Sequence, residues 1–286
     1  MILLKLIITG SSGYLGSKVV NLLKHYSAEL ILIDQNNPAN RVNLNNKASI
    51  KSLLARNDCE YELIHLAGQL PGVASAKELI NNANESIRNL LDVVNPRRVL
   101  FVSSTAVYPR EVNSEELVPS PWETYGKSKL MVENYILENS PNFTIYRCGT
   151  MYDKDRTGGI QKIITRGISG KQIYLPNYGQ VFHPFIATSD VANAIYKWVQ
   201  SGNFLKNKVL DLVSLNPITM QNLISSRATG NVKIGNLPKI AKKLGSDNLP
   251  IMGISKWHLN ALFYNINKFQ NMTPELNINS MASLLD

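Results

Sequence analysis

The sequence contains little of what several protein classes require. Its two cysteines, Cys59 and Cys148, are too few for a disulfide framework and show no metal-ligand spacing, so we expect reduced thiols and no metal site. No apolar run approaches the ~20 residues that a membrane-spanning helix needs. The apolar start MILLKLIITG is interrupted by Lys5 and lacks the charged region and cleavage site of a signal peptide. We therefore predict a buried first strand and a cytoplasmic protein with no membrane association.

The net charge of +9 is also not concentrated in any dense basic run. Lysine and arginine are scattered, with short clusters such as Arg97-Arg98 and Lys242-Lys243, and no aromatic residues alternate with them as in a nucleic-acid groove. We therefore expect no nucleic-acid partner. A positive balance suits an anionic ligand such as a dinucleotide or a sugar nucleotide, and it is equally typical of solvated surface charge.

The first two-thirds of the chain alternates short apolar runs with longer segments of helical periodicity. Strands are expected at 3–9, 29–34, 61–67, 98–104 and 143–149, and helices at 17–26, 48–57, 77–94 and 125–139. Continuous apolar strands between helices are typical of a parallel sheet covered on both faces. The sequence therefore predicts an α/β fold with a doubly wound parallel sheet.

A glycine-rich segment, TGSSGYLG at 9–16, follows the first expected strand and opens a helix. Glycine permits a tight turn and a close approach of the backbone to pyrophosphate, and the helix N-terminus supplies free N–H groups to the phosphates. The position indicates a Rossmann-type dinucleotide site, although the spacing is G-x-x-G-x-x-G. The expected cofactor contacts are Gly10, Ser12, Gly13, Tyr14, Leu15 and Gly16.

An acidic residue ends the second expected strand. Asp34 lies 24 residues after Gly10, where a carboxylate can accept hydrogen bonds from both adenosine ribose hydroxyls. The same charge would repel a 2′-phosphate, so it favours NAD over NADP, while nearby Arg41 keeps NADP open. We assign the adenine edge to Asn43 and Leu44.

Beyond residue 150 the pattern is broken by glycine and proline, before a helix at 189–200 and a strand at 208–213. We predict a dinucleotide-binding domain over residues 1–150, to which 185–213 return. A smaller substrate-binding lobe is then expected from 151–184 and 214–286.

Two more strand ends carry residues suited to a cofactor and a reacting oxygen. The small residues of HLAG (65–68) would let the cofactor lie against Leu66, Ala67 and Gly68, and we expect His65 to be a packed structural residue. Farther along, SSTAVY (103–108) ends its strand with three hydroxyls, which can hydrogen-bond a substrate alcohol or form an ordinary turn.

The stretch TYGKSKLMVEN (124–134) places one tyrosine ahead of two lysines. On a helix, residues four apart share a face, whereas residues two apart point to nearly opposite sides. Tyr125 and Lys129 should therefore lie together, and Lys127 should face elsewhere.

These four motifs together resemble the extended short-chain dehydrogenase/reductase family, also called the NAD-dependent epimerase/dehydratase family. The resemblance covers roughly residues 3–200, with TGSSGYLG, HLAG, SSTAVY and YGKSK in order. It implies an NAD-dependent enzyme in which Tyr125 is the general acid/base. A tyrosine pKa near 10 is too high for a base at neutral pH, but a nearby ammonium and a positive nicotinamide favour the phenolate.

The resemblance also assigns the remaining roles. It places Lys129 on the nicotinamide ribose, the catalytic hydroxyl on Ser104 and Ser103 in the cofactor site. Thr105 is a possible substitute for Ser104 and a substrate contact. Dehydratases carry an acidic pair after that hydroxyl, and Thr105-Ala106 stands there instead, which disfavours dehydration.

Two other positions depart from the sugar-nucleotide members. Thr150 stands where a substrate-binding asparagine is common, and His183 replaces the arginine that would pair with the substrate pyrophosphate. A neutral imidazole offers one donor where a guanidinium offers a charged fork.

We therefore expect a nucleotide-sugar epimerase, because Asp34 favours a recycled NAD. The alternatives are an NAD(P)H-dependent 4-ketosugar-nucleotide reductase and a non-catalytic dinucleotide sensor on the same fold. The resemblance also implies a homodimer formed through the helices at 77–94 and 125–139.

Overall fold

The computed structural model describes most of the chain up to residue 236. The described ranges are 3–36, 41–54, 59–69, 75–109, 118–153, 160–180, 182–202, 205–213 and 218–236. Residues 214–217 and 237–286, which we assigned to the smaller lobe, lie outside them. Among the described helices, none is both long enough and apolar enough to cross a membrane.

The chain divides into two compact units, and the first contains the large sheet. This unit comprises residues 1–108, 119–148 and 189–211. Its elements are β1 (Leu3–Thr9), α1 (Tyr14–Leu23), β2 (Glu29–Ile33), α2 (Lys47–Leu53), β3 (Cys59–His65), α3 (Ala76–Val94), β4 (Arg98–Ser104), the 3-10 turn η1 (Thr105–Val107), α4 (Thr124–Asn139), β5 (Phe143–Cys148), α6 (Thr188–Gln200) and β10 (Lys208–Leu212). The predicted α/β fold with a parallel sheet is confirmed.

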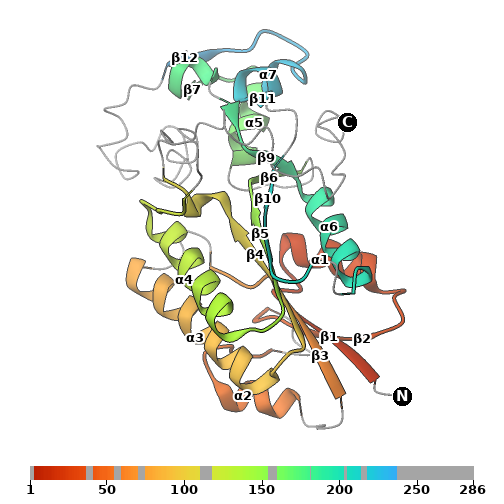
Figure 1. The fold of residues 1–286 in the computed structure, drawn as a ribbon. Coiled ribbons are helices and arrows are strands. Elements are labelled where there is room, and N and C mark those ends of the chain that lie inside the picture. The colour runs from red at the N-terminus through yellow and green to blue at the C-terminus, as the bar shows by residue number, and fades with distance from the viewer. Residues whose placement is uncertain are drawn as a thin grey trace. The chain divides into compact units, whose positions relative to one another are not determined.

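The six strands follow the order β10-β5-β4-β3-β1-β2, and the pairings from β2 to β5 are all parallel. Figure 1 shows α3 and α4 on one side of this sheet and α1 and α6 on the other. Parallel strands joined by helices in this way bring their carboxyl ends to one edge, which is where ligands bind in such folds.

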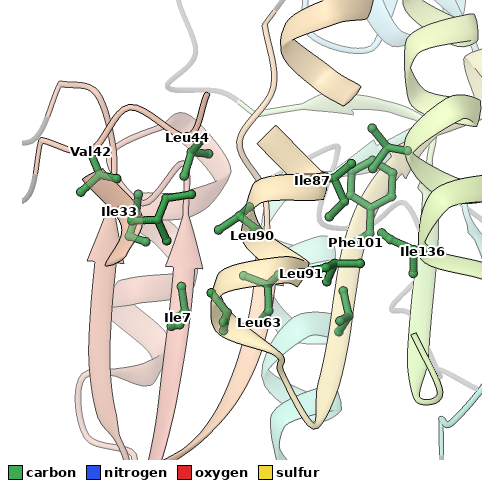
Figure 2. Packing of buried hydrophobic residues seen from close by; sticks show 14 of the residues in the cluster. Ile7, Ile33, Val42, Leu44, Leu63, Ile87, Leu90, Leu91, Phe101 and Ile136 are labelled. Carbon is green, nitrogen blue, oxygen red and sulfur yellow. The ribbon is translucent and has the colours of Figure 1, made fainter. Parts of the chain in front are cut away.

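Strand alternation determines which side chains form the core beneath α3 and α4. Ile7, Leu63 and Val99 stand next to one another in the register and point to the same face, where they meet Ile87 and Leu90 of α3. Figure 2 shows these helix side chains packing down onto the strands. Toward the carboxyl edge the same face continues through Phe101 and Ser103, because side chains alternate with a period of two.

Several element boundaries differ from the expected ones, and three of them lie at the glycine turn or at strand ends that carry predicted motifs. Helix α1 begins at Tyr14 rather than residue 17, because its N-cap is Gly13 of the glycine turn itself. Strand β3 ends at His65, so Leu66, Ala67 and Gly68 form a loop beyond the sheet. Strand β5 ends at Cys148, one residue before the expected end.

The second unit comprises residues 109–118, 149–188 and 212–286 and is built from short elements. They are β6 (Thr150–Tyr152), α5 (Ile160–Ile168), β7 (Ile173–Leu175), the 3-10 turn η2 (Pro176–Gly179), β8 (Phe182–His183), β9 (Phe185–Ala187), β11 (Ile218–Thr219), α7 (Met220–Ser225) and β12 (Ile234–Asn236). Its own core packs Ile164 of α5 against Leu223 and Ile224 of α7. The sequence pattern gave no indication of these short strands.

Two adjacent leucines of α1 test this account of the core. Leu23 is fully buried, whereas Leu22 is 37% exposed. Leu23→Ala should lower the free energy of unfolding by about 2–5 kcal/mol, because it removes buried methyl groups and leaves a cavity. Leu22→Ala, which changes helix propensity equally, should cost less than about 1 kcal/mol. Urea unfolding followed by circular dichroism measures both, and equal losses would contradict the assigned orientation of α1.

Candidate active site

A cavity of about 430 Å³ runs along the carboxyl edge of the sheet in the first unit. Its lining comes from the glycine turn, the end of β2, the loop before α2, the loop after β3, and helices α3 and α4. The sequence-predicted residues that line it are Gly10, Gly13, Asp34, Leu44, Leu66, Ala67, Gly68, Tyr125 and Lys129. Residues predicted from five separate stretches of sequence are therefore brought together around one cavity.

The glycine turn is held by very close backbone contacts. Gly10 adopts a φ of +70°, and a Cβ built on it would come within 2.8 Å of the Ala67 amide nitrogen. A Cβ on Gly16 would come within 2.0 Å of the Gly10 carbonyl oxygen. Glycine is required at both positions, because a side chain would push α1 away from β1 and from the loop after β3. Ser12, Tyr14 and Leu15 complete the turn and the first residues of α1.

Asp34 closes the other side of the turn. Its carboxylate accepts hydrogen bonds from the Ser12 amide at 3.1 Å and from the Asn36 amide at 2.8 Å. Burial raises the pKa of Asp34, but the hydrogen bonds from Asn36 and Ser12 outweigh it, so the pKa is lowered overall. The group is therefore a stable anion at the cavity wall.

The loop before α2 is fixed by amide side chains, of which only Asn43 was an expected site residue. Asn43 Oδ1 accepts the Asn45 amide at 3.0 Å, which closes a local turn, and Leu44 O accepts from buried Asn89 at 3.0 Å. Asn45 donates to Asn82 of α3 at 2.8 Å, and Asn82 donates to Gln69 at 3.1 Å. Asn45, Asn82 and Gln69 also line the cavity. None of the three was among the expected site residues.

His65 is a packed residue of the cavity floor. It is 2% exposed, its Nδ1 lies 2.8 Å from the Thr9 hydroxyl, and its ring stacks on Phe101 with centroids 5.5 Å apart. The structural role expected for it agrees with these contacts. Burial, reinforced by the charge of Lys129, lowers the pKa of His65 to about 3.

Tyr125 and Lys129 lie at the start of α4 and both line the cavity. Lys129 Nζ donates to the Val102 carbonyl at 3.1 Å, and it lies 4.9 Å from the Phe101 ring centroid and 5.9 Å from the Tyr125 ring centroid. Burial lowers the pKa of Lys129 to about 8, against the opposing effect of Cys148 and Glu133. Lys127 is exposed, so the four-residue spacing selected the lysine that lies beside the tyrosine.

The predicted hydroxyl residues lie around the end of β4 and do not line the cavity. Ser103 is buried and donates to Glu133 in a short hydrogen bond. Ser104 Oγ accepts the Ala106 amide at 3.2 Å, which starts η1, and Thr105 is buried in that turn. The geometry thus places Ser103 toward α4 and leaves Ser104 as the partly exposed hydroxyl.

The two remaining substrate candidates lie in the second unit. Thr150 begins β6 and donates its amide to Pro184 O at 2.6 Å. His183 lies in β8, paired with Ile218 of β11, and its side chain is not among those described.

Comparison with known proteins decides the family. A model described as the NAD dependent epimerase/dehydratase family matches residues 6–211. The chain belongs to this family. The match includes the glycine turn, Asp34, the end of β4 and the Tyr125–Lys129 pair.

Individual relatives are more distant than this family match. "UDP-glucose 4-epimerase 2" of Oryza sativa is 28% identical over 45% of the chain and 38% of the relative. The match therefore spans well under half of the plant protein. A "Putative UDP-glucose 4-epimerase" of Methanocaldococcus jannaschii is 25% identical over 66% of the chain and 71% of the relative.

Solved structures support the same fold. A UDP-glucose 4-epimerase of Thermus thermophilus, in complex with NAD, matches 93% of this chain and 99% of its own, with a TM-score of 0.61 and 15% identity. At this level of identity the likeness establishes the fold alone.

The buried histidine gives the site a testable pH response. The pKa of His65 is about 3 in the folded protein against 6.5 as a reference, so between these values the unfolded chain binds the additional proton. Its contribution to stability is complete above pH 6.5 and is lost as the pH falls toward 3. In His65→Gln, the free energy of unfolding should therefore fall less steeply as the pH is lowered from 6.5 to 3. Urea unfolding at several pH values measures it, and identical slopes in both proteins would contradict the assignment.

Proposed function

We propose that this chain is an NAD-dependent nucleotide-sugar epimerase. The observation that carries the proposal is the position of Lys129. Its partly buried ammonium is held by the Val102 carbonyl beside the Tyr125 ring, in a cavity that is also lined by the glycine turn and Asp34. A cation next to a phenol at a dinucleotide cavity is the arrangement that proton transfer coupled to hydride transfer requires.

The residues present fit a dinucleotide. The turn from Gly10 to Gly13 directs the N-terminus of α1 toward the phosphate end of the cavity, where backbone N–H groups bind anions. At the opposite end, a Cβ on Gly68 would come within 3.3 Å of Lys129 Nζ, so glycine leaves room for a ring. Ser11 Oγ is buried without a hydrogen-bond partner among the described residues, which adds an unsatisfied polar group to the turn.

In this proposal a bound NAD would take up the hydride and give it back, and the protein moves the proton. Tyr125 removes a proton from a sugar hydroxyl and returns it to the same oxygen when the hydride is returned to the opposite face of the ketone. Lys129 stabilises the phenolate and binds the nicotinamide ribose, and Ser104 hydrogen-bonds the reacting oxygen. Asp34 selects NAD because its carboxylate accepts ribose hydroxyls and repels a 2′-phosphate.

We also propose that Thr105 of η1 in the first unit contacts the substrate. The second unit is proposed as a substrate lobe, with Thr150 and His183 as its contacts. The relatives named as UDP-glucose 4-epimerases support a nucleotide sugar as the substrate. Localisation in the cytoplasm belongs to the same proposal.

A homodimer is proposed through α3 and α4. A surface depression along these two helices is lined by Asn84 and Arg88 of α3 and by Leu130, Met131 and Tyr135 of α4. Such a face, with apolar side chains between polar ones, is suited to packing against a second copy of itself.

A ligand panel tests the cofactor and the substrate class. NAD should raise the melting temperature more than NADP, since ligand at 100 times its Kd stabilises the native state by about 2.7 kcal/mol. Asp34→Asn should reduce the difference between the NAD and NADP shifts in melting temperature, because it removes the charge that repels the 2′-phosphate. UDP-, GDP-, dTDP- and CDP-sugars are added in the presence of NAD. A larger shift with NADP would refute the role of Asp34, and no shift with any sugar nucleotide would refute the substrate class.

The two lysines of α4 provide a matched pair for the catalytic assignment. Lys129→Met should lower the interconversion of UDP-glucose and UDP-galactose by roughly 10²- to 10⁴-fold, the range of a lost acid-base contribution, and should weaken NAD binding. Lys127→Met should change neither quantity. A coupled assay for UDP-glucose and calorimetry with NAD give the two readouts, and the reverse pattern would overturn the site.

A further inference from the structure

A chain of buried polar side chains runs behind the candidate active site, from β4 to β10, entirely within the first unit. Its members are Ser103, Glu133, Arg147, Tyr108 and Asp211. Arg147 is central: Nε and Nη2 donate to the Glu133 carboxylate at 2.6–3.2 Å, and Nη1 donates to the Tyr108 hydroxyl at 2.9 Å. The Glu133 side chain is fully buried, and that of Arg147 is 11% exposed.

One end of this chain fixes the helix that carries the proposed acid/base. Glu133 follows Lys129 by four residues and Tyr125 by eight, so all three lie on one face of α4. Lys129 is tied to the Val102 carbonyl of β4, and Glu133 is tied one turn later to Arg147 of β5. These two contacts, one helical turn apart, determine the rotation of α4 about its axis. They thereby determine the position of the Tyr125 ring.

The other end fixes the turn that carries the proposed hydroxyl. Ser104 starts η1, and the Tyr108 amide closes that turn on Thr105 O at 3.1 Å. The Tyr108 hydroxyl contacts both Asp211 oxygens at 2.8 and 2.9 Å. Tyr108 therefore anchors the far end of the turn to Arg147 and to β10.

We propose that Arg147 is a positioning residue, whose single guanidinium sets the helix of Tyr125 and Lys129 against the turn of Ser104. This inference rests on the proposed function, because it concerns the geometry of that catalytic group. The planar fork of arginine is what makes the connection: one edge grips the Glu133 carboxylate while the remaining nitrogen reaches Tyr108. Arg147 itself is not among the described residues that line the cavity.

The charges around Arg147 determine which substitution is informative. Glu133, Asp211 and the Tyr108 phenol surround the guanidinium, and Cys148 lies next in sequence on β5. Burial raises the pKa of Asp211 to about 6, although Tyr108 and Arg147 counteract it. Removing the cation would leave a buried carboxylate unpaired, which is strongly destabilising. Arg147→Lys retains the charge, but one ammonium cannot hold both partners in the same geometry.

The experiment separates position from stability by two readouts. Arg147→Lys should lower kcat for UDP-galactose epimerisation by about 10- to 100-fold, as small displacements of catalytic groups do, with KM within about 2-fold. The second readout is the ionisation of Tyr125, taken from near-ultraviolet phenolate absorbance minus that of the same protein carrying Tyr125→Phe. Its midpoint should move to higher pH in Arg147→Lys, because the ammonium of Lys129 is no longer held beside the ring.

Two further variants serve as a control and as a dissection. Arg97→Lys makes the same change at the residue before β4, outside the described lining of the cavity, and should leave both readouts at wild-type values. Tyr108→Phe breaks the link to the Ser104 turn but keeps the Glu133 contact. It should lower kcat without moving the Tyr125 midpoint. Its effect on kcat should not add to that of Ser104→Ala, because both substitutions act on catalysis through the Ser104 hydroxyl.

Wild-type kcat and a wild-type Tyr125 midpoint in folded Arg147→Lys would overturn the inference. If Arg147→Lys does not fold, Glu133→Gln is used in its place. The Tyr125 midpoint should again move to higher pH, and wild-type kcat with a wild-type midpoint would again overturn the inference. Should the wild-type protein turn over no sugar nucleotide, the proposed function fails, and the Tyr125 titration alone then decides the inference.

Discussion

The partly buried ammonium of Lys129 is the constraint around which the candidate site is arranged. A cation removed from water needs polar and polarisable neighbours, and here they are the Val102 carbonyl and the faces of Phe101 and Tyr125. These contacts hold the start of α4 against the end of β4. The same ammonium lies close enough to Gly68 that a side chain there would intrude on it. One charge thus determines the helix position and the tyrosine position, and the glycine in the loop after β3 leaves room beside it.

The alternation of β4 explains how one face of the sheet serves both the core and the site. Val99 lies in the apolar core beneath α3 and α4, Phe101 stacks on His65, and Ser103 bonds Glu133. These residues point the same way because they are two apart, so the face changes from apolar to polar as the strand approaches its carboxyl end. The apolar part stabilises the fold, and the polar part positions groups without burying an unpaired charge.

The sequence patterns predicted the large sheet well because its strands are long, continuous and apolar, and its helices are periodic. They also selected Lys129 over Lys127, since four-residue spacing is a local property of a helix. The contact of Arg147 with Tyr108 and that of Tyr108 with Asp211 could not be predicted in this way. They join residues 39 and 103 positions apart, and no period in the sequence encodes such pairs. The short strands after residue 150 were missed for a related reason, because two- and three-residue strands hold too few side chains to show alternation.

Cofactor choice and loop structure are coupled at Asp34. A carboxylate that contacted only the adenosine ribose could be substituted without structural cost when cofactor preference changes from NAD to NADP. Here its two oxygens also accept the amides of Ser12 and Asn36, so it holds the glycine turn against the end of β2. Replacing it with a small or basic residue would remove the repulsion of a 2′-phosphate and would also release both amides. The turn would lose both hydrogen bonds in the same step, each worth about 0.5–1.5 kcal/mol. Under the role proposed for Asp34, selectivity for NAD is linked to these two hydrogen bonds of the turn, and a change of cofactor at this position would call for a second substitution that restores them.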